Sequence, residues 1–193
     1  MTRSTVRLQK GLLTALSDAV ARTVDLPAEP TVVFEALCQA MSDRRDGRPV
    51  KLIIRSFPEE LANTHTGLWL DLEDHDLVIV EEGLAPDHKL VVLGHELWHM
   101  HAGHCGHDLD GNAAAARAAL AEHVDWEMAW EMVRSVAARA HSYAADELAA
   151  ERFGLRMSET LSPWLASANN PRNLDDAVAR RIGASLGYTG LQG

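Results

Sequence analysis

The sequence predicts an α+β fold that is mainly helical and carries one small three-stranded sheet. Apolar residues recur at intervals of three or four through much of the first 48 residues, which is the period of a helix with one buried face. Between residues 50 and 81, apolar residues instead recur at every second position over 50–54 and 68–72 and form a short run over 77–80, which is typical of strands. An apolar run then leads into a further helical segment. Because 193 residues are enough to bury a core, we expect a single domain.

Residues 1–48 are predicted to form two helices, the second of which opens at Pro30. The basic N-terminus also resembles a signal peptide, but Asp18 interrupts the short apolar stretch, which favours an amphipathic helix. Cys38 falls at a core position of the second helix, where a small apolar side chain is commoner than a reactive thiol. The expected buried faces consist of Leu8, Leu12, Leu16 and Val20 in the first helix and of Val33, Leu37 and Met41 in the second.

The sheet is expected between residues 50 and 81. Its first strand stops at Phe57, which precedes a proline. The second and third strands are separated only by the polar turn that ends at Asp76, and this spacing predicts a hairpin. The apolar residues expected in these strands are Val50, Leu52 and Ile54, then Leu68, Leu70 and Leu72, and finally Leu77 to Val80.

A pair of histidines lies in the next predicted helix, residues 86–103. His95, Glu96 and His99 form the motif HExxH. Residues four apart lie above one another on a helix, so both imidazoles can bind one metal ion, with the glutamate beside them. Neutral imidazole is a good zinc ligand, and a carboxylate beside a zinc site can take the proton of an attacking water. The motif therefore predicts His95 and His99 as zinc ligands and Glu96 as a general base.

A third ligand is expected downstream, because a catalytic zinc takes three protein ligands and keeps one position for water. The candidate is Glu147, in a helix predicted over residues 142–156. Glu147, Ala150 and Phe153 form the pattern E-x-x-A-x-x-F. A spacing of three keeps Glu147 and Ala150 on one face, where a small residue lets this helix pack close to the metal helix. A lone helical glutamate is more often a solvated charge, so this prediction depends on the HExxH motif.

HExxH followed by E-x-x-A-x-x-F, with a small sheet before it, resembles the ImmA/IrrE family of metallopeptidases over residues 50–153. The likeness is greatest to actinobacterial members described as toxin components of toxin–antitoxin systems. The resemblance implies a gluzincin-like, zincin-type core with the sheet packed beside the metal helix. It also implies a zinc ion held by His95, His99 and Glu147, with Glu96 as the catalytic glutamate.

The resemblance further implies a function. Family members are zinc peptidases that cleave or otherwise inactivate a helix-turn-helix repressor, usually encoded beside them. We therefore expect a zinc-dependent metallo-endopeptidase whose partner is a regulatory protein, such as a repressor or an antitoxin. Residues 66–71 are a candidate edge for adding an extended substrate as a strand, although a hairpin with a purely structural role fits the pattern equally well.

Two further functions are compatible with the same residues. The first is a zinc hydrolase that acts on a small molecule. The second is a toxin- or repressor-binding module on a peptidase-like fold with little or no proteolysis, because a fold alone does not establish an activity. The presence of Glu96 favours an enzyme over the binding module.

Other polar residues near the motif are candidates for supporting roles. His104, five positions after the second ligand, is common in the family and is expected near the zinc or on the substrate side. His141 and Tyr143 are candidate hydrogen-bond donors to a developing oxyanion. His101 and His107 are expected to be exposed loop histidines, because glycines interrupt the helix here.

Two more helical segments complete the predicted domain. Residues 108–140 are rich in alanine and carry tryptophan and methionine at helical spacing, so we expect a helical insertion that packs against the core. This insertion accounts for the sequence distance between His99 and Glu147, which is longer than expected for the family. Residues 172–193 are expected to form a C-terminal helix.

Charge and cysteine content limit the classes of partner and the compartment. A formal net charge of −10 at pH 7 provides no basic stripe for phosphate groups, so we expect a protein partner rather than direct binding to nucleic acid. Only Cys38 and Cys105 are present, which are too few for a disulfide framework and suit the reducing cytoplasm. No apolar run is long enough to cross a bilayer, so no membrane partner is expected.

Overall fold

The computed structural model describes residues 3–57, 65–103 and 144–166. This part of the chain is α+β, with long helices and a small sheet, as the sequence predicts. The elements are helices α1 (Arg3–Thr23), α2 (Pro30–Arg44), α4 (Pro86–Ala102) and α7 (Ala144–Leu161), strands β1 (Val50–Arg55), β2 (Gly67–Asp71) and β3 (Asp76–Glu81), and a 3-10 turn, η1 (Ser162–Trp164).

The three strands form a mixed sheet in the order β1-β3-β2. The predicted hairpin is confirmed, because β2 runs antiparallel to β3, with Trp69 opposite Val78. Strand β1 pairs with the other side of β3 in parallel, a connection that the sequence pattern does not reveal. Strand β2 is therefore an edge strand within the described part of the sheet.

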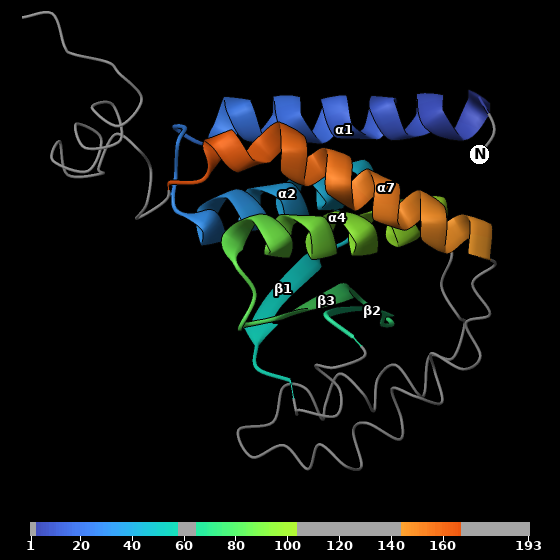
Figure 1. Ribbon diagram of the computed structural model, residues 1–193. Coiled ribbons are helices and arrows are strands. Elements are labelled where there is room, and N and C mark those ends of the chain that lie inside the picture. The colour runs from blue at the N-terminus through green and yellow to red at the C-terminus, as the bar shows by residue number, and fades with distance from the viewer. Residues whose placement is uncertain (1–2, 58–64, 104–143, 167–193) are drawn as a thin grey trace, which may run out of the picture.

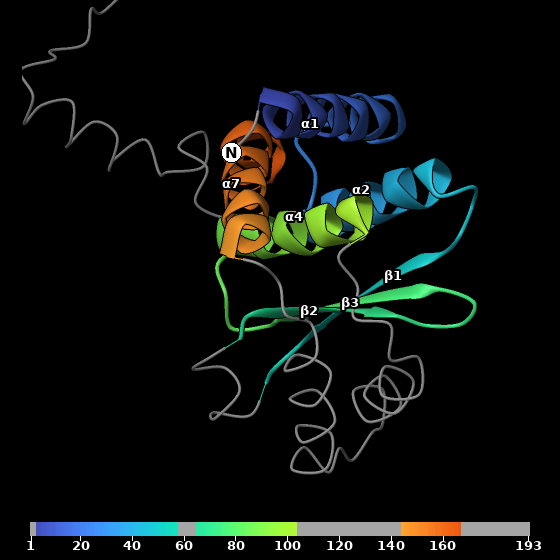
Figure 2. The ribbon, with the colours of Figure 1, turned by 90° about the vertical axis from the view of Figure 1, so that its right-hand side faces the viewer.

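The helices lie in layers on one side of the sheet (Figures 1 and 2). Helices α2 and α4 come next to the strands, with α2 over β1 and α4 over β2 and β3. Helix α1 lies beyond them, and α7 packs along α4 on a side that faces away from the sheet. Helix α4 is consequently held between a helix and a strand.

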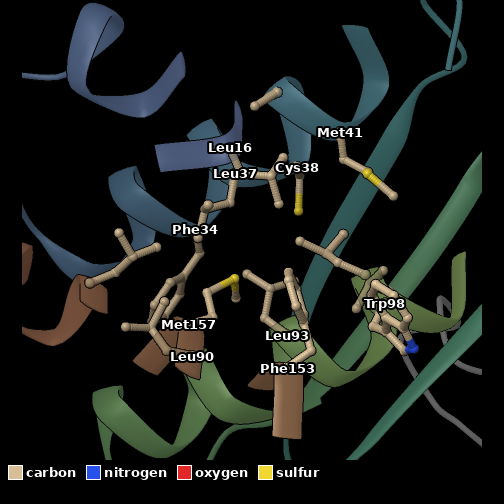
Figure 3. Packing of buried hydrophobic residues seen from close by; sticks show 14 of the residues in the cluster. Leu16, Phe34, Leu37, Cys38, Met41, Leu90, Leu93, Trp98, Phe153 and Met157 are labelled. Atoms are coloured by element: carbon tan, nitrogen blue, oxygen red, sulfur yellow. The ribbon is translucent and has the colours of Figure 1, made fainter. Parts of the chain in front are cut away.

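The main core fills the space between these helices and the near face of the sheet (Figure 3). Phe34 from α2, Leu93 from α4 and Phe153 from α7 meet there, each with 2% exposure or less. Cys38 belongs to this core, and burial raises the pKa of its thiol to about 12, which confirms a packing role. A second apolar cluster, made of Leu70, Leu72, Leu77 and Ile79, occupies the other face of the sheet.

The first helix buries most of its predicted face, with one correction. Leu12, Leu16 and Val20 are buried, but Leu8 is 55% exposed. The neighbouring Gln9 is buried instead and donates a hydrogen bond from Nε2 to the Ala149 carbonyl of α7, at 2.7 Å. This bond satisfies a buried amide group and attaches α1 to the helix that carries Glu147.

The helix that contains HExxH has clear boundaries. Pro86 lies in its first turn, where a missing N–H costs nothing, and Gly103 ends it in the left-handed conformation with φ of 72°. Because the helix continues to Ala102, the prediction of His101 as an exposed loop residue is wrong. His101 is half-buried, and its ring lies 5.8 Å from that of Trp98. Helix α7 also runs to Leu161, farther than the predicted end at residue 156.

A buried carboxylate ties the start of β3 to the end of α2. Asp76 is fully buried and pairs with Nε of Arg45 at 3.1 Å and with Nε of Arg48 at 2.9 Å. Its second oxygen accepts a hydrogen bond from the Trp69 indole at 2.9 Å. Arg45 also donates to the Met100 carbonyl near the end of α4, at 3.1 Å. This group of side chains therefore connects α2, α4 and both strands of the hairpin.

Two of the predicted segments, the helical insertion at residues 108–140 and the C-terminal helix at residues 172–193, lie outside the described residues. Among the helices of the described residues, none combines the length and the apolar character that crossing a membrane requires.

Replacing Asp76 with alanine is expected to lower the free energy of unfolding by about 3 kcal/mol, because two arginines lose their buried partner. Urea denaturation followed by circular dichroism measures this change. Asp74→Ala is the matched control, since the Asp74 side chain is 83% exposed, and its denaturation midpoint should stay at the wild-type value. Equal midpoints for Asp76→Ala and the wild type would show that the buried carboxylate does not stabilise the fold.

Candidate metal centre

Helix α4 brings the two histidines of HExxH together on one face. The Nε2 atoms of His95 and His99 are 3.0 Å apart, and their rings are 4.6 Å apart at an angle of 63°. His99 is buried, whereas His95 is only half-buried. Burial lowers the pKa of His95, and the charges of Glu147 and Glu151 act in the opposite direction. The neutral imidazole, which is the metal-binding form, is thereby favoured at His95.

Helix α7 adds a carboxylate to this pair. The two oxygens of Glu147 lie 3.4 Å from His95 Nε2 and 3.5 Å from His99 Nε2. Within the described ranges, these three residues are the group whose donor atoms converge closely enough for a metal ion, all within 4.8 Å of one another. The placement of Glu147 beside both histidines agrees with the sequence prediction.

The spacing of these donors suits zinc. With zinc–nitrogen and zinc–oxygen bonds of about 2.0–2.1 Å, two ligand atoms of a tetrahedral site lie about 3.3 Å apart. The observed separations of 3.0, 3.4 and 3.5 Å are close to that value. Two imidazoles and one carboxylate are also a donor set that zinc accepts in catalytic sites, with a fourth position left over. The residues therefore fit the metal that the sequence motif implies.

Glu96 lies between the two histidines in the sequence of α4, and its side chain reaches strand β2. Its carboxylate accepts a hydrogen bond from the backbone N–H of Trp69. A Cβ atom built on Gly67 would lie 2.3 Å from Val92 Cγ1 and 3.0 Å from Glu96 Oε1, so a larger residue at position 67 would force these side chains or the strand to move. Burial raises the pKa of Glu96 to about 8, the charge of Glu147 adds to the increase, and the bond from Trp69 opposes it. The Glu96 carboxylate is thus buried beside the edge strand, although the residue as a whole keeps some exposure.

The anchor of Glu96 is itself held by the buried carboxylate of Asp76. The Trp69 indole donates to Asp76 Oδ1, while the Trp69 backbone N–H serves Glu96. Sequence reasoning missed this connection, because no periodicity indicates that a backbone group of residue 69 faces a helix. Gly67 did offer a signal, since a glycine inside a strand pattern often marks a close backbone approach.

Several predicted site residues cannot be placed around this centre. His104, His141 and Tyr143, proposed as supporting residues, lie outside the described residues, as does His107. His101 is described, but it packs against Trp98 and does not join the group formed by the three ligand candidates.

Comparisons of the chain with protein-family models, with curated proteins and with solved structures give no match. The class of the site therefore depends on the residues and their geometry.

Replacing Glu147 with alanine is expected to weaken zinc binding by roughly 100-fold or more, because a direct ligand matters at least as much as the residues that orient ligands. Isothermal titration of metal-free protein measures the affinity. Glu151→Ala is the matched control, because Glu151 lies one turn further along α7, is exposed and only adds charge near His95. Similar losses in both variants would point to a general charge effect and would exclude Glu147 as a ligand.

The raised pKa of Glu96 predicts a pH-dependent stability in the metal-free protein. Between the usual glutamate pKa of 4.5 and about 8, the folded chain holds a proton that the unfolded chain has lost. The stabilising contribution of this proton is complete below pH 4.5 and is lost as the pH rises to 8. The wild type should therefore lose stability between about pH 5 and about pH 8, whereas Glu96→Gln has no proton to lose at this position. The free energy of unfolding of Glu96→Gln minus that of the wild type should increase over this range.

Urea denaturation of the metal-free wild type and of Glu96→Gln at several pH values tests this prediction. The exposed Glu159→Gln in α7 controls for the substitution itself. A stability difference between Glu96→Gln and the wild type that does not vary with pH would contradict the shift in pKa.

Proposed function

We propose that this protein is a zinc-dependent metallo-endopeptidase with a zincin-like core, as the resemblance to the ImmA/IrrE family implies. The observation that carries the proposal is the convergence of His95 and His99 with Glu147, at separations that suit a tetrahedral zinc. Their neighbour Glu96 is a second carboxylate, which lies close enough to Glu147 for the charge of Glu147 to act on it and is bonded to the backbone of strand β2. A purely structural zinc site has no need for such a residue.

Each residue has a defined role in this proposal. His95, His99 and Glu147 would hold the zinc, which when bound lowers the pKa of a water and polarises a carbonyl. Glu96 takes the proton from the attacking water and passes it to the amine that leaves. The bond from Trp69 N–H limits the motion of the Glu96 carboxylate, so that the proton acceptor stays in one place relative to β2.

The outer edge of strand β2, within the described sheet, is an argument for a peptide substrate. Backbone bonds join Glu81 N–H to the Thr66 carbonyl at 2.9 Å and Leu72 N–H to the His75 carbonyl at 3.0 Å. In this register the backbone N–H and C=O groups of the even-numbered residues of β2 bond to β3, and those of the odd-numbered residues point to the outer edge, where the Trp69 N–H meets Glu96. An extended peptide that added to this edge would therefore run beside the general base.

The resemblance and the charge suggest the nature of the substrate. Members of the family act on helix-turn-helix repressors, and we propose a regulatory protein of that kind, or an antitoxin, as the substrate. A net charge of −10 favours a basic protein partner, and the two cysteines suit a cytoplasmic setting.

Mass spectrometry of newly formed protein termini in host cells tests the proposal. Cells that express the wild type should contain at least one new terminus that is missing in cells that express Glu96→Gln. The Gln variant keeps the size of the side chain and the metal ligands but lacks a proton acceptor. Glu159→Gln, with the same substitution at an exposed site on α7, should give the wild-type set of termini.

Identical termini in wild-type and Glu96→Gln cells, at equal protein levels and with zinc bound, would contradict a peptidase. Robust metal-dependent hydrolysis of unrelated small esters and amides would also count against a dedicated protein substrate. It would favour a small-molecule hydrolase instead.

A further inference from the structure

Helices α4 and α7 touch through their backbones at two glycines. A Cβ atom built on Gly94 would lie 2.9 Å from the Cα of Gly154. A Cβ built on Gly154 would lie 2.3 Å from the Val91 carbonyl oxygen and 3.2 Å from the His95 nitrogen. Side chains essentially never approach backbone atoms to 2.3 Å, so a larger residue at position 154 requires the helices to separate.

The place of this contact matters for the metal centre. In an α-helix, the carbonyl of Val91 is the acceptor for the N–H of His95, four residues later. Gly154 therefore lies directly on the helical turn that carries the first histidine ligand. A side chain at position 154 would collide with atoms of the α4 backbone, and these atoms cannot rotate away as a flexible side chain can.

Two other contacts fix the course of α7 along α4. At one end, the Ser158 hydroxyl donates to the Asp87 carbonyl at 2.9 Å. At the other end, Glu147 meets His95 and His99. The two helices are antiparallel, and Gly154 lies between these ends, two turns beyond Glu147. A change in separation at Gly154 is therefore transmitted along a rigid helix to the Glu147 carboxylate.

Glycine destabilises a helix relative to alanine, so its presence at position 154 needs a reason, and the close helix contact provides one. Glycine inside a helix is less favourable than alanine, because the unfolded chain has more freedom to lose. Gly11 of α1 has nothing within 4 Å of its built Cβ, so alanine fits there. At Gly154 the same methyl group meets backbone atoms, so the glycine permits an approach that no other residue allows.

We infer that Gly154, together with Gly94, is a positioning residue for the metal centre. It sets the separation of α7 and α4, and this separation brings the Glu147 carboxylate within ligand distance of the ion held by the histidines. The inference rests on the proposed zinc site and names a residue outside the ligand set that determines its geometry.

The test compares Gly154→Ala with Gly11→Ala in the full chain, each with and without Glu147→Ala. Zinc affinity is measured by titration, and cobalt is used as a second metal because its visible spectrum reports the coordination geometry. Gly154→Ala should keep the far-UV circular dichroism of the wild type and bind zinc at least about tenfold more weakly, with a changed cobalt spectrum. Gly11→Ala should match the wild type in both measurements.

The double variants separate positioning from general destabilisation. If Gly154 acts through Glu147, then removing Glu147 should weaken binding strongly in the wild type and in Gly11→Ala, but only slightly in Gly154→Ala. Should Gly154→Ala not fold, Gly94→Ala replaces it, because its built Cβ meets Gly154 Cα and Met157 Cε at 2.9 Å and needs a smaller displacement.

Two results would overturn the inference, and they are distinguishable. Zinc binding and a cobalt spectrum equal to the wild type in a folded Gly154→Ala or Gly94→Ala would show that the glycine contact does not set the ligand geometry. A wild-type chain that binds neither zinc nor cobalt would overturn the proposed metal centre itself, and the inference with it.

Discussion

The close contact between α4 and α7 determines whether the three candidate ligands can meet. The histidines of HExxH lie on one helix and need only helical geometry to face the same point. The third donor, Glu147, is distant in sequence and reaches them only because the second helix lies against the first. Core packing around Phe153, the bond from Gln9 and the bond from Ser158 all act on α7, so much of the helical layer serves to place one carboxylate.

Helix α4 carries the candidate metal ligands and the proposed general base, and these residues contact different neighbouring elements. Its side toward α7 carries the histidines and meets Glu147, whereas Glu96 faces β2 and accepts a bond from Trp69. Asp76 stabilises that second side through the Trp69 indole and two arginines. The geometry of the ligands and the geometry of the proposed base are thus supported by different parts of the fold. A substitution that disturbs one of them need not disturb the other.

Local patterns predicted much of this arrangement. The helical spacing of Leu12 and Leu16, the strand segments and the helix that carries HExxH each reflect short-range patterns, and the structure confirms these elements. A regular alternation of buried and exposed residues is not found in the strands, because both faces of the sheet are covered by apolar clusters and five successive residues of β3 are buried. The burial of Gln9 in place of Leu8 depends on a partner in α7, which no local pattern contains. The parallel pairing of β1 with β3 and the approach of Trp69 to Glu96 are equally non-local. The prediction for His101 was wrong because the glycine that ends α4 comes after it, at Gly103.

Diffraction from crystals of the zinc-loaded protein, with data collected at the zinc absorption edge, would locate the metal directly. The proposed site requires one anomalous peak about 2.0–2.2 Å from a nitrogen of His95, a nitrogen of His99 and an oxygen of Glu147. Glu96 should remain outside the coordination sphere, next to Trp69. A zinc ion held by the histidines without Glu147, or a peak elsewhere with none at HExxH, would show that the proposed site is wrong.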